Sequence, residues 1–380
     1  MKEFKKLTIK NLYKSYGDFK VLNDFNLTVE TGEFVTFLGP SGCGKSTALN
    51  CICGLIPITS GEIIIDDVCI DNGKDICVPP EKREFGMVFQ NYALFPHMTV
   101  TKNIAFGLEL KKLKREEINK RVTDAVNVVH LQGFENKFPG QLSGGQQQRV
   151  AIARCIVMEP RLLMLDEPLS NLDAKLRMEM RQELKSLHER LHIPTIYVTH
   201  DQSEALALSD KIVVLKRGLV MQIGSPEEIY ARPLNLFVAS FMGFKNFWRG
   251  KITDLMEEGD FLELHIDLGG AKLISKRDYT AKELRKKNML KQAFQNGQPV
   301  ETAIRPDDFA LAEGQDNIIR AKVDLVSYVG NVNEINAVSE TGLPLDAKIT
   351  SQKALGNQYL SFFAPPEKVQ VFVIEGTDEE

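Results

Sequence analysis

The chain has 380 residues, of which 43% are hydrophobic and 26% charged, a composition typical of a globular protein long enough for two domains. Its formal net charge of -4 argues against a dedicated nucleic-acid-binding protein, which would usually show a basic patch, so no nucleic-acid partner is expected. No stretch approaches the roughly 18 consecutive apolar residues of a transmembrane helix. Residues 1–10 lack the apolar core of a signal peptide, so we expect the protein to stay in the cytoplasm.

The first part of the chain alternates short β-rich runs with helical ones, the pattern of an α/β domain with a mainly parallel sheet. Between about residues 100 and 150 the pattern changes to amphipathic helix, as in residues 115–131. We therefore expect an α/β domain at residues 1–240 with a helical subdomain inserted at about residues 91–150. The expected strands are residues 33–38, 62–65, 86–89, 162–165, 195–198 and 211–215.

The pattern after Pro226 predicts one more helical stretch, which continues through Phe241, and the sequence changes character at residues 243–250. Beyond it, short alternating runs such as residues 261–266 are separated by turn signals and predict strands. Residues 241–380 are therefore expected to form a second, all-β domain, a small barrel.

A glycine-rich segment follows the expected strand at residues 33–38 and opens an apolar helix, which is the context of a phosphate-binding P-loop. Its glycines let backbone N–H groups turn toward phosphate oxygens at a helix N-terminus, whose dipole favours anions. Lys45 is expected to reach the β- and γ-phosphates of a nucleotide, and the Ser46 hydroxyl to bind Mg²⁺. The segment consists of Gly39, Pro40, Ser41, Gly42, Cys43, Gly44, Lys45, Ser46 and Thr47.

An apolar strand at residues 162–165 ends in two carboxylates, Asp166 and Glu167. A parallel sheet exposes the carboxyl ends of its strands at one edge, so we expect these carboxylates next to the P-loop. Asp166 fits a residue that holds Mg²⁺ through water, and Glu167 fits a general base that orients the water attacking the γ-phosphate. Solvated carboxylates commonly end strands, so the pair is informative only because a P-loop precedes it.

A second glycine-led helix start contains Ser143, Gly144, Gly145 and Gln146, whose backbone can meet phosphate oxygens. With the P-loop before it and two carboxylates after it, this segment resembles the signature sequence of ATP-binding cassette (ABC) ATPases, between their Walker A and Walker B motifs. The resemblance covers roughly the first 240 residues. It implies ATP and Mg²⁺ as cofactors and a RecA-like, mainly parallel sheet with an antiparallel β part.

The same resemblance assigns roles to further positions. Tyr16 corresponds to an aromatic residue that stacks on adenine, although read alone it is also compatible with an ordinary strand tyrosine. Gln90 corresponds to a glutamine that contacts Mg²⁺ and the attacking water. Asp173 corresponds to the D-loop aspartate, and His200 to a histidine that contacts the γ-phosphate, where a lone histidine would more often be structural. The expected catalytic residues are Glu167, His200, Gln90 and Lys45, and the expected metal-binding residues are Ser46, Gln90 and Asp166.

Two positions depart from the pattern of the family. Asn171 stands where many members have alanine, and Cys43 occupies a variable position of the P-loop. A thiol at a helix N-terminus is favoured as the thiolate, so we expect Cys43 to be reactive and its alkylation to block nucleotide binding.

The resemblance also implies partners. In this family the signature of one subunit completes the site of another, which implies a homodimer that binds ATP between the P-loop of one copy and residues 143–146 of its partner. One ATPase unit with an added β domain is the layout of the ATPase subunit of bacterial importers, a peripheral protein on the cytoplasmic face of the membrane. Residues 90–100 resemble the segment that receives a transmembrane permease, which works with an extracytoplasmic solute-binding protein.

Residues from about 247 to the end resemble the C-terminal TOBE domain of these importers, an oligonucleotide-binding-like barrel that serves dimer contact or regulation. The importer group takes up polyamines, ferric iron, sugars, sulfate or phosphonates. The motif sequences and the overall length are most similar to those of polyamine (spermidine/putrescine) or ferric-iron importers. A non-transport regulatory ABC ATPase stays open as an alternative, although intact Glu167 and His200 argue against it.

Overall fold

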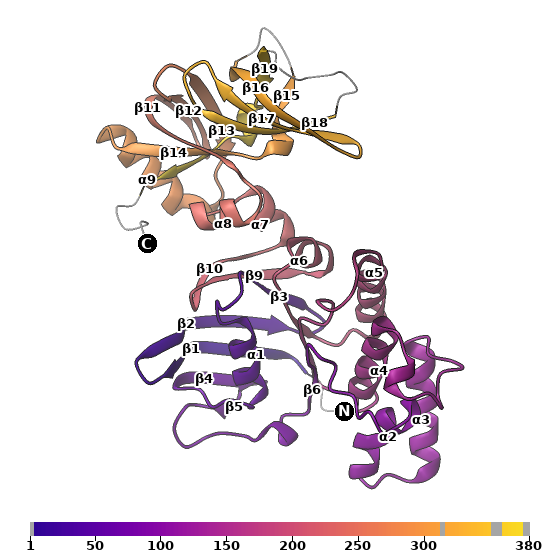
Figure 1. The fold of residues 1–380 in the computed structure, drawn as a ribbon. Coiled ribbons are helices and arrows are strands. Elements are labelled where there is room, and N and C mark those ends of the chain that lie inside the picture. Colours follow the sequence, from indigo (N-terminus) through magenta and orange to yellow (C-terminus); the bar gives the residue numbers. More distant parts are fainter. Residues whose placement is uncertain (1–3, 312–315, 351–358, 375–380) are drawn as a thin grey trace. The chain divides into compact units, whose positions relative to one another are not determined.

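The computed structural model describes residues 4–311, 316–350 and 359–374, and the chain divides into two compact units, Met1–Arg232 and Pro233–Glu380 (Figure 1). Each unit has its own hydrophobic core. The second unit thus begins before the expected boundary at residue 240 and includes a short helix that the sequence pattern placed with the first.

A six-stranded sheet in the order β10-β9-β3-β8-β7-β6 forms the centre of the first unit. The strands from β9 to β6 are parallel, and β10 pairs antiparallel with β9 at one edge. All five residues of β3 and of β8 are buried, as expected for a sheet covered on both faces. The strands are β3 (Phe34–Leu38), β6 (Phe85–Val88), β7 (Leu162–Asp166), β8 (Thr195–Thr199), β9 (Lys211–Lys216) and β10 (Leu219–Gly224).

A separate antiparallel sheet in the order β2-β1-β4-β5 is the antiparallel part that the resemblance implied. Its first two strands form a hairpin closed at Gly17, whose φ of 57° lies in the left-handed region that glycine adopts freely. The expected strand at residues 62–65 belongs to this sheet, whereas β1 and β2 were not among the expected strands. The strands are β1 (Lys6–Tyr16), β2 (Phe19–Glu30), β4 (Ser60–Ile65) and β5 (Val68–Asp71).

Helices cover the two faces of the parallel sheet, and alternate residues of β7 show the division. Leu162 and Met164 pack into the core that contains α1 and the antiparallel sheet, whereas Leu163 and Leu165 pack into the core that contains α2 to α5. The helices are α1 (Lys45–Cys53), α2 (Val100–Leu110), α3 (Arg115–Val128), α4 (Gly144–Ile156), α5 (Ala174–Leu191), α6 (Gln202–Leu208) and α7 (Pro226–Ala231).

The helical stretch expected through Phe241 is broken into α7 and α8 (Leu236–Phe241). Pro233 lies between them, and a proline disfavours helical backbone at the residue before it. The expectation of one continuous stretch was therefore wrong.

The second unit contains two five-stranded antiparallel sheets that share one hydrophobic core. It is not all-β, because α9 (Leu284–Gln295) packs on it, and the barrel of a TOBE domain stays a prediction. One sheet has the order β13-β12-β11-β14-β20, from β11 (Asn246–Glu258), β12 (Phe261–Asp267), β13 (Lys272–Asp278), β14 (Pro299–Ile304) and β20 (Gln370–Val373). The other has the order β15-β19-β16-β17-β18, from β15 (Ala310–Leu311), β16 (Ile318–Val329), β17 (Val332–Ser339), β18 (Pro344–Ile349) and β19 (Tyr359–Phe363).

Candidate functional site

Four of the predicted segments lie at one edge of the parallel sheet. The P-loop follows β3, Gln90 follows β6, Glu167 follows β7, and His200 follows β8. These strands are consecutive neighbours in the order β3-β8-β7-β6 and run in the same direction. Their carboxyl ends therefore meet at one edge, the usual place for a ligand in a sheet of this kind.

The P-loop encloses Lys45, a residue that is only 4% exposed. Its Nζ donates hydrogen bonds to the carbonyl oxygens of Gly39 at 2.8 Å and Pro40 at 2.9 Å. Gly42 and Gly44 have φ of 79° and 104°, which only glycine adopts without strain. The P-loop thus begins a helix, the position that favours phosphate oxygens, and the contact of Lys45 with phosphates stays a prediction.

Ser46 and Asp166 meet directly, because the Ser46 hydroxyl donates a hydrogen bond of 2.8 Å to the Asp166 carboxylate. Burial raises the pKa of Asp166, and the Ser46 hydrogen bond and the charge of Lys45 oppose that rise while the charge of Glu167 adds to it. A hydroxyl and a carboxylate are the hard oxygen ligands that Mg²⁺ prefers, and a cation would relieve the unfavourable burial of this charge. The pair therefore fits a magnesium ion completed by phosphate oxygens and water.

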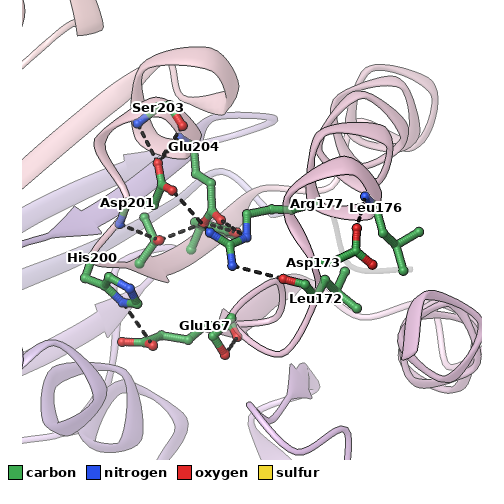
Figure 2. Close-up of polar contacts among 12 residues, drawn as sticks. Glu167, Leu172, Asp173, Leu176, Arg177, His200, Asp201, Ser203 and Glu204 are labelled. Carbon is green, nitrogen blue, oxygen red and sulfur yellow. Dashed lines mark hydrogen bonds and ion pairs between the residues drawn. The ribbon is translucent and has the colours of Figure 1, made fainter. Parts of the chain in front are cut away.

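Glu167 and His200 form a carboxylate–imidazole pair, with Nδ1 of His200 3.2 Å from Oε2 of Glu167 (Figure 2). The His200 side chain is 53% exposed and that of Glu167 is 18% exposed, so both can meet a ligand at the edge of the sheet. Glu167 has a left-handed φ of 44°, a conformation that costs energy for a residue other than glycine and that clusters at functional sites. Its backbone N–H donates to the Val198 carbonyl at 3.0 Å, which fixes the residue beside β8.

Gln90 is held by the segment that follows Glu167. Its side-chain amide donates to the Ser170 hydroxyl at 3.3 Å, and the Asn171 amide donates to the Gln90 carbonyl at 2.9 Å. Ser170 in turn donates to the Glu167 carbonyl at 2.8 Å. Asn171, a departure from the family pattern, thus connects two predicted site segments, which the sequence did not reveal.

Tyr16 and Asp173 lie at the ends of β1 and of the loop before α5. Tyr16 is 53% exposed, and the Lys14 ammonium lies over its ring, 4.6 Å from the centroid, so stacking of Tyr16 on adenine stays a prediction. The Asp173 carboxylate accepts a hydrogen bond of 3.0 Å from the Leu176 backbone N–H and so caps α5. The role of Asp173 toward a nucleotide stays a prediction.

The signature residues lie on α4, outside the strand edge that gathers the other segments; α4 lies with α2 and α3 in Figure 1. Ser143 begins the helix in a capping box, in which its hydroxyl accepts from the Gln146 N–H and the Gln146 side chain accepts from the Ser143 N–H. Gly144 and Gly145 form the first turn. This end of the helix presents the backbone N–H groups that phosphate oxygens favour.

Cys43 corrects one expectation. The residue is 3% exposed, and burial raises the pKa of its thiol although the nearby Lys45 charge opposes the rise. Desolvation of the thiolate, which raises the pKa, thus outweighs the helix N-terminus, which lowers it. The expectation of a reactive thiolate was therefore wrong. Cys43 is a buried part of the P-loop wall.

Three charged residues beside the site were missed by the sequence analysis: Arg177, Asp201 and Glu204 (Figure 2). Asp201 caps α6 by accepting from the backbone of Ser203 and Glu204. An aspartate followed three residues later by a glutamate is typical of an ordinary helix start, so the sequence carried no signal of a site. Only the fold brings Arg177 of α5 to them.

Comparisons with known proteins agree with this geometry. A family model described as ABC transporter matches residues 22–170. CbiO1 from Clostridium perfringens, described as part of the ABC transporter complex cbiONQ, is 34% identical over 60% of this chain and 90% of its own, with a TM-score of 0.55. The ATP-binding cassette MJ0796, solved as a dimer in a post-hydrolysis state bound to ADP and Pi, is 36% identical over 58% of this chain and 98% of its own, with a TM-score of 0.51.

A further structure of MJ0796, described as dimeric and as a bacterial ABC transporter cassette, is also 36% identical, with a TM-score of 0.52. The chain belongs to the ABC transporter family. It is an ATP-binding subunit that hydrolyses ATP in a reaction coupled to transport. Within the described part of the chain, no helix has both the length and the apolar character needed to span a membrane.

Proposed function

We propose that two copies of this chain pair and drive solute import through a membrane permease, on the cytoplasmic face of the membrane. The observation that carries the proposal is the separation of two phosphate-binding helix starts, one at the sheet edge with Glu167 and His200 and the other on α4. In this proposal each helix start supplies half of an ATP site. The dimeric state of MJ0796 and the transporter complex that contains cbiO1 support this arrangement.

In the proposed mechanism, the P-loop backbone and Lys45 hold the phosphates. Glu167 orients a water molecule and accepts its proton, while His200, whose Nδ1 lies 3.2 Å from Glu167, contacts the γ-phosphate. Mg²⁺, held by Ser46 and Asp166, supplies charge neutralisation when bound. Prearranged donors of this kind contribute most of the catalysis in phosphoryl transfer, because the protein mainly positions and neutralises the reacting groups.

Magnesium dependence follows from the Ser46–Asp166 pair. We expect a chelator to abolish ATP hydrolysis and added Mg²⁺ to restore it. Ser46→Ala removes one oxygen ligand and should raise the Mg²⁺ concentration for half-maximal activity by roughly tenfold. This factor corresponds to the lower end of the free energy that a hydrogen bond to a charged group contributes. Ser60→Ala, at an exposed serine of β4, is the matched control. Equal Mg²⁺ requirements for the two variants would contradict this role of Ser46.

We propose that the permease docks at residues 90–100 and reaches a cavity of about 830 Å³ whose lining includes Leu110, Arg154 and Met158. The Arg154 guanidinium donates to the carbonyl oxygens of Tyr92 and Ala93 at 2.9 and 2.7 Å. A partner seated there would therefore contact the same side chain that holds the loop after Gln90. This path connects the permease to the hydrolysis site.

The second unit is proposed to be a TOBE domain that contributes to dimer contact or regulation. The segment of this unit that best resembles a TOBE domain includes Arg305, which is buried. Its Nε donates to the Met242 carbonyl at 3.1 Å, and its guanidinium lies 3.9 Å from the Phe244 ring centroid. These contacts support a structural part for the matched residues rather than direct ligand binding.

The proposed cargo is a polyamine or ferric iron, and sugars, sulfate and phosphonates are the other candidates. The translocated solute contacts the permease and the binding protein, so uptake by a strain that lacks this chain, measured with each candidate, identifies it. ATPase activity measured with and without the reconstituted permease tests coupling itself. Stimulation by the permease supports an importer motor, and an unchanged rate with no uptake defect would favour the regulatory alternative.

A further inference from the structure

The guanidinium of Arg177 joins two segments of the site that are separate in sequence (Figure 2). Arg177 lies in the first turns of α5, and its NH2 donates a hydrogen bond of 3.0 Å to the carbonyl of Leu172, in the loop after Glu167. On its other side, NH1 lies 3.6 Å from the Asp201 carboxylate and Nε lies 4.0 Å from the Glu204 carboxylate. One side chain thus contacts the loops that follow β7 and β8.

The two residues whose carboxylates face Arg177 belong to a hydrogen-bond network that includes both sequence neighbours of His200. Glu204 is only 3% exposed and accepts hydrogen bonds from the Thr199 hydroxyl at 2.7 Å and the Tyr197 hydroxyl at 2.8 Å. The Asp201 backbone N–H donates to the Thr199 hydroxyl at 3.0 Å. His200 therefore lies between two residues that are tied to this network.

We propose that Arg177 is a positioning residue that sets His200 against Glu167 by holding the loops after β7 and β8 together. This inference depends on the proposed roles of Glu167 and His200 in hydrolysis. Arg177 acts through the Leu172 carbonyl on one loop and through Asp201 and Glu204 on the other. Its planar guanidinium suits the task, because it directs several N–H groups to fixed positions, whereas a lysine ammonium is a single point charge.

Loss of the guanidinium would leave two neighbouring carboxylates without their shared cation, one of them almost fully buried. The loop that carries His200 would then lose its attachment to the loop after β7 and shift. A displacement of about 1 Å in a catalytic group can lower turnover by about 10²-fold. The P-loop and Tyr16 do not belong to this network, so nucleotide affinity should change little.

Arg177→Gln tests the proposal, with Lys175→Gln as the matched control, because Lys175 is an exposed cation on the same helix. We expect Arg177→Gln to lower kcat for ATP by about 10- to 100-fold with KM changed by less than about twofold, and Arg177→Lys to recover part of the loss. Lys175→Gln should behave as the unmodified protein. An Arg177→Gln protein with unchanged kcat, or with a loss confined to KM, would overturn the proposal.

A double variant shows whether Arg177 acts through His200. If it does, Arg177→Gln should cost much less kcat in a His200→Ala background than in the unmodified protein, because the group that it positions is already absent. Fully multiplicative losses would overturn the proposal. Glu204→Gln keeps the shape and an acceptor for Thr199 and Tyr197 but weakens one of the contacts between Arg177 and this loop, so it should lower kcat in the same direction, by less than Arg177→Gln, and it can be measured even if Arg177→Gln fails to fold.

These variants separate the two levels of the proposal. Undiminished turnover in His200→Ala would contradict the proposed role of His200 in hydrolysis. Turnover lost in His200→Ala but retained in both Arg177→Gln and Glu204→Gln would leave the proposed function intact and remove only the positioning role of Arg177.

Discussion

Replacement of Glu167 by glutamine is expected to lower ATP turnover by about 10²- to 10⁴-fold, the usual contribution of a general base, while ATP binding is retained. Glutamine keeps the shape of the side chain and an oxygen that can face His200, which lies 3.2 Å from the native carboxylate. It cannot accept the proton of the attacking water. ATP that is bound but not hydrolysed should then hold two chains together, so the variant should accumulate as an ATP-bound dimer.

Two measurements check this expectation: the rate of phosphate release, and the molecular mass in solution with and without MgATP. Glu189→Gln is the matched control, because Glu189 is an exposed glutamate on α5 away from the strand edge. It should leave both measurements unchanged. Full turnover in Glu167→Gln, or a variant that stays monomeric with saturating ATP, would show that Glu167 does not have the proposed role.

Replacement of Lys45 by alanine is expected to weaken ATP binding rather than only its hydrolysis. The ammonium is buried in the P-loop and bonded to the Gly39 and Pro40 carbonyls, where phosphate oxygens can replace these partners. Loss of charge-assisted hydrogen bonds costs about 1.5–3 kcal/mol, which corresponds to roughly 10- to 150-fold in Kd. Titration with a non-hydrolysable ATP analogue measures this change directly.

Lys74→Ala removes an exposed lysine and serves as the control for the loss of positive charge. The two main predictions differ in kind, since Glu167→Gln should bind ATP without hydrolysing it and Lys45→Ala should bind ATP more weakly. An unaltered Kd in Lys45→Ala would contradict the proposed phosphate contact, whatever its effect on turnover.

The sequence revealed the parts of the site that depend on local chemistry. Phosphate and Mg²⁺ binding requires glycines around Lys45 and carboxylates after β7, and few other functions require these residue types at these positions. A parallel sheet then places the two segments together. The contacts of Asn171 and Arg177 could not be foreseen. Each depends on two loops approaching one another in space, Asn171 reaching the Gln90 carbonyl and Arg177 reaching Asp201.

One error in the predicted elements, an all-β second domain without α9, has a similar cause. The helix α9 presents two lysines, Lys286 and Lys287, among its buried residues, so its sequence lacks a clear apolar stripe. Lys286 Nζ instead donates to the Pro233 carbonyl at 3.0 Å and lies 3.8 Å from the Phe372 ring centroid. These long-range contacts, which sequence periodicity does not record, allow a polar helix to pack in the second unit.

The most direct test of the central claim, that each ATP site combines two chains, is to mix two inactive variants. Lys45→Ala disables the P-loop, and Ser143→Asp keeps a good helix cap on α4 while placing a negative charge where phosphate is expected. A mixed dimer would contain one site with both lesions and one intact site. We expect ATPase activity to reappear on mixing; a mixture no more active than the separate variants would contradict the claim.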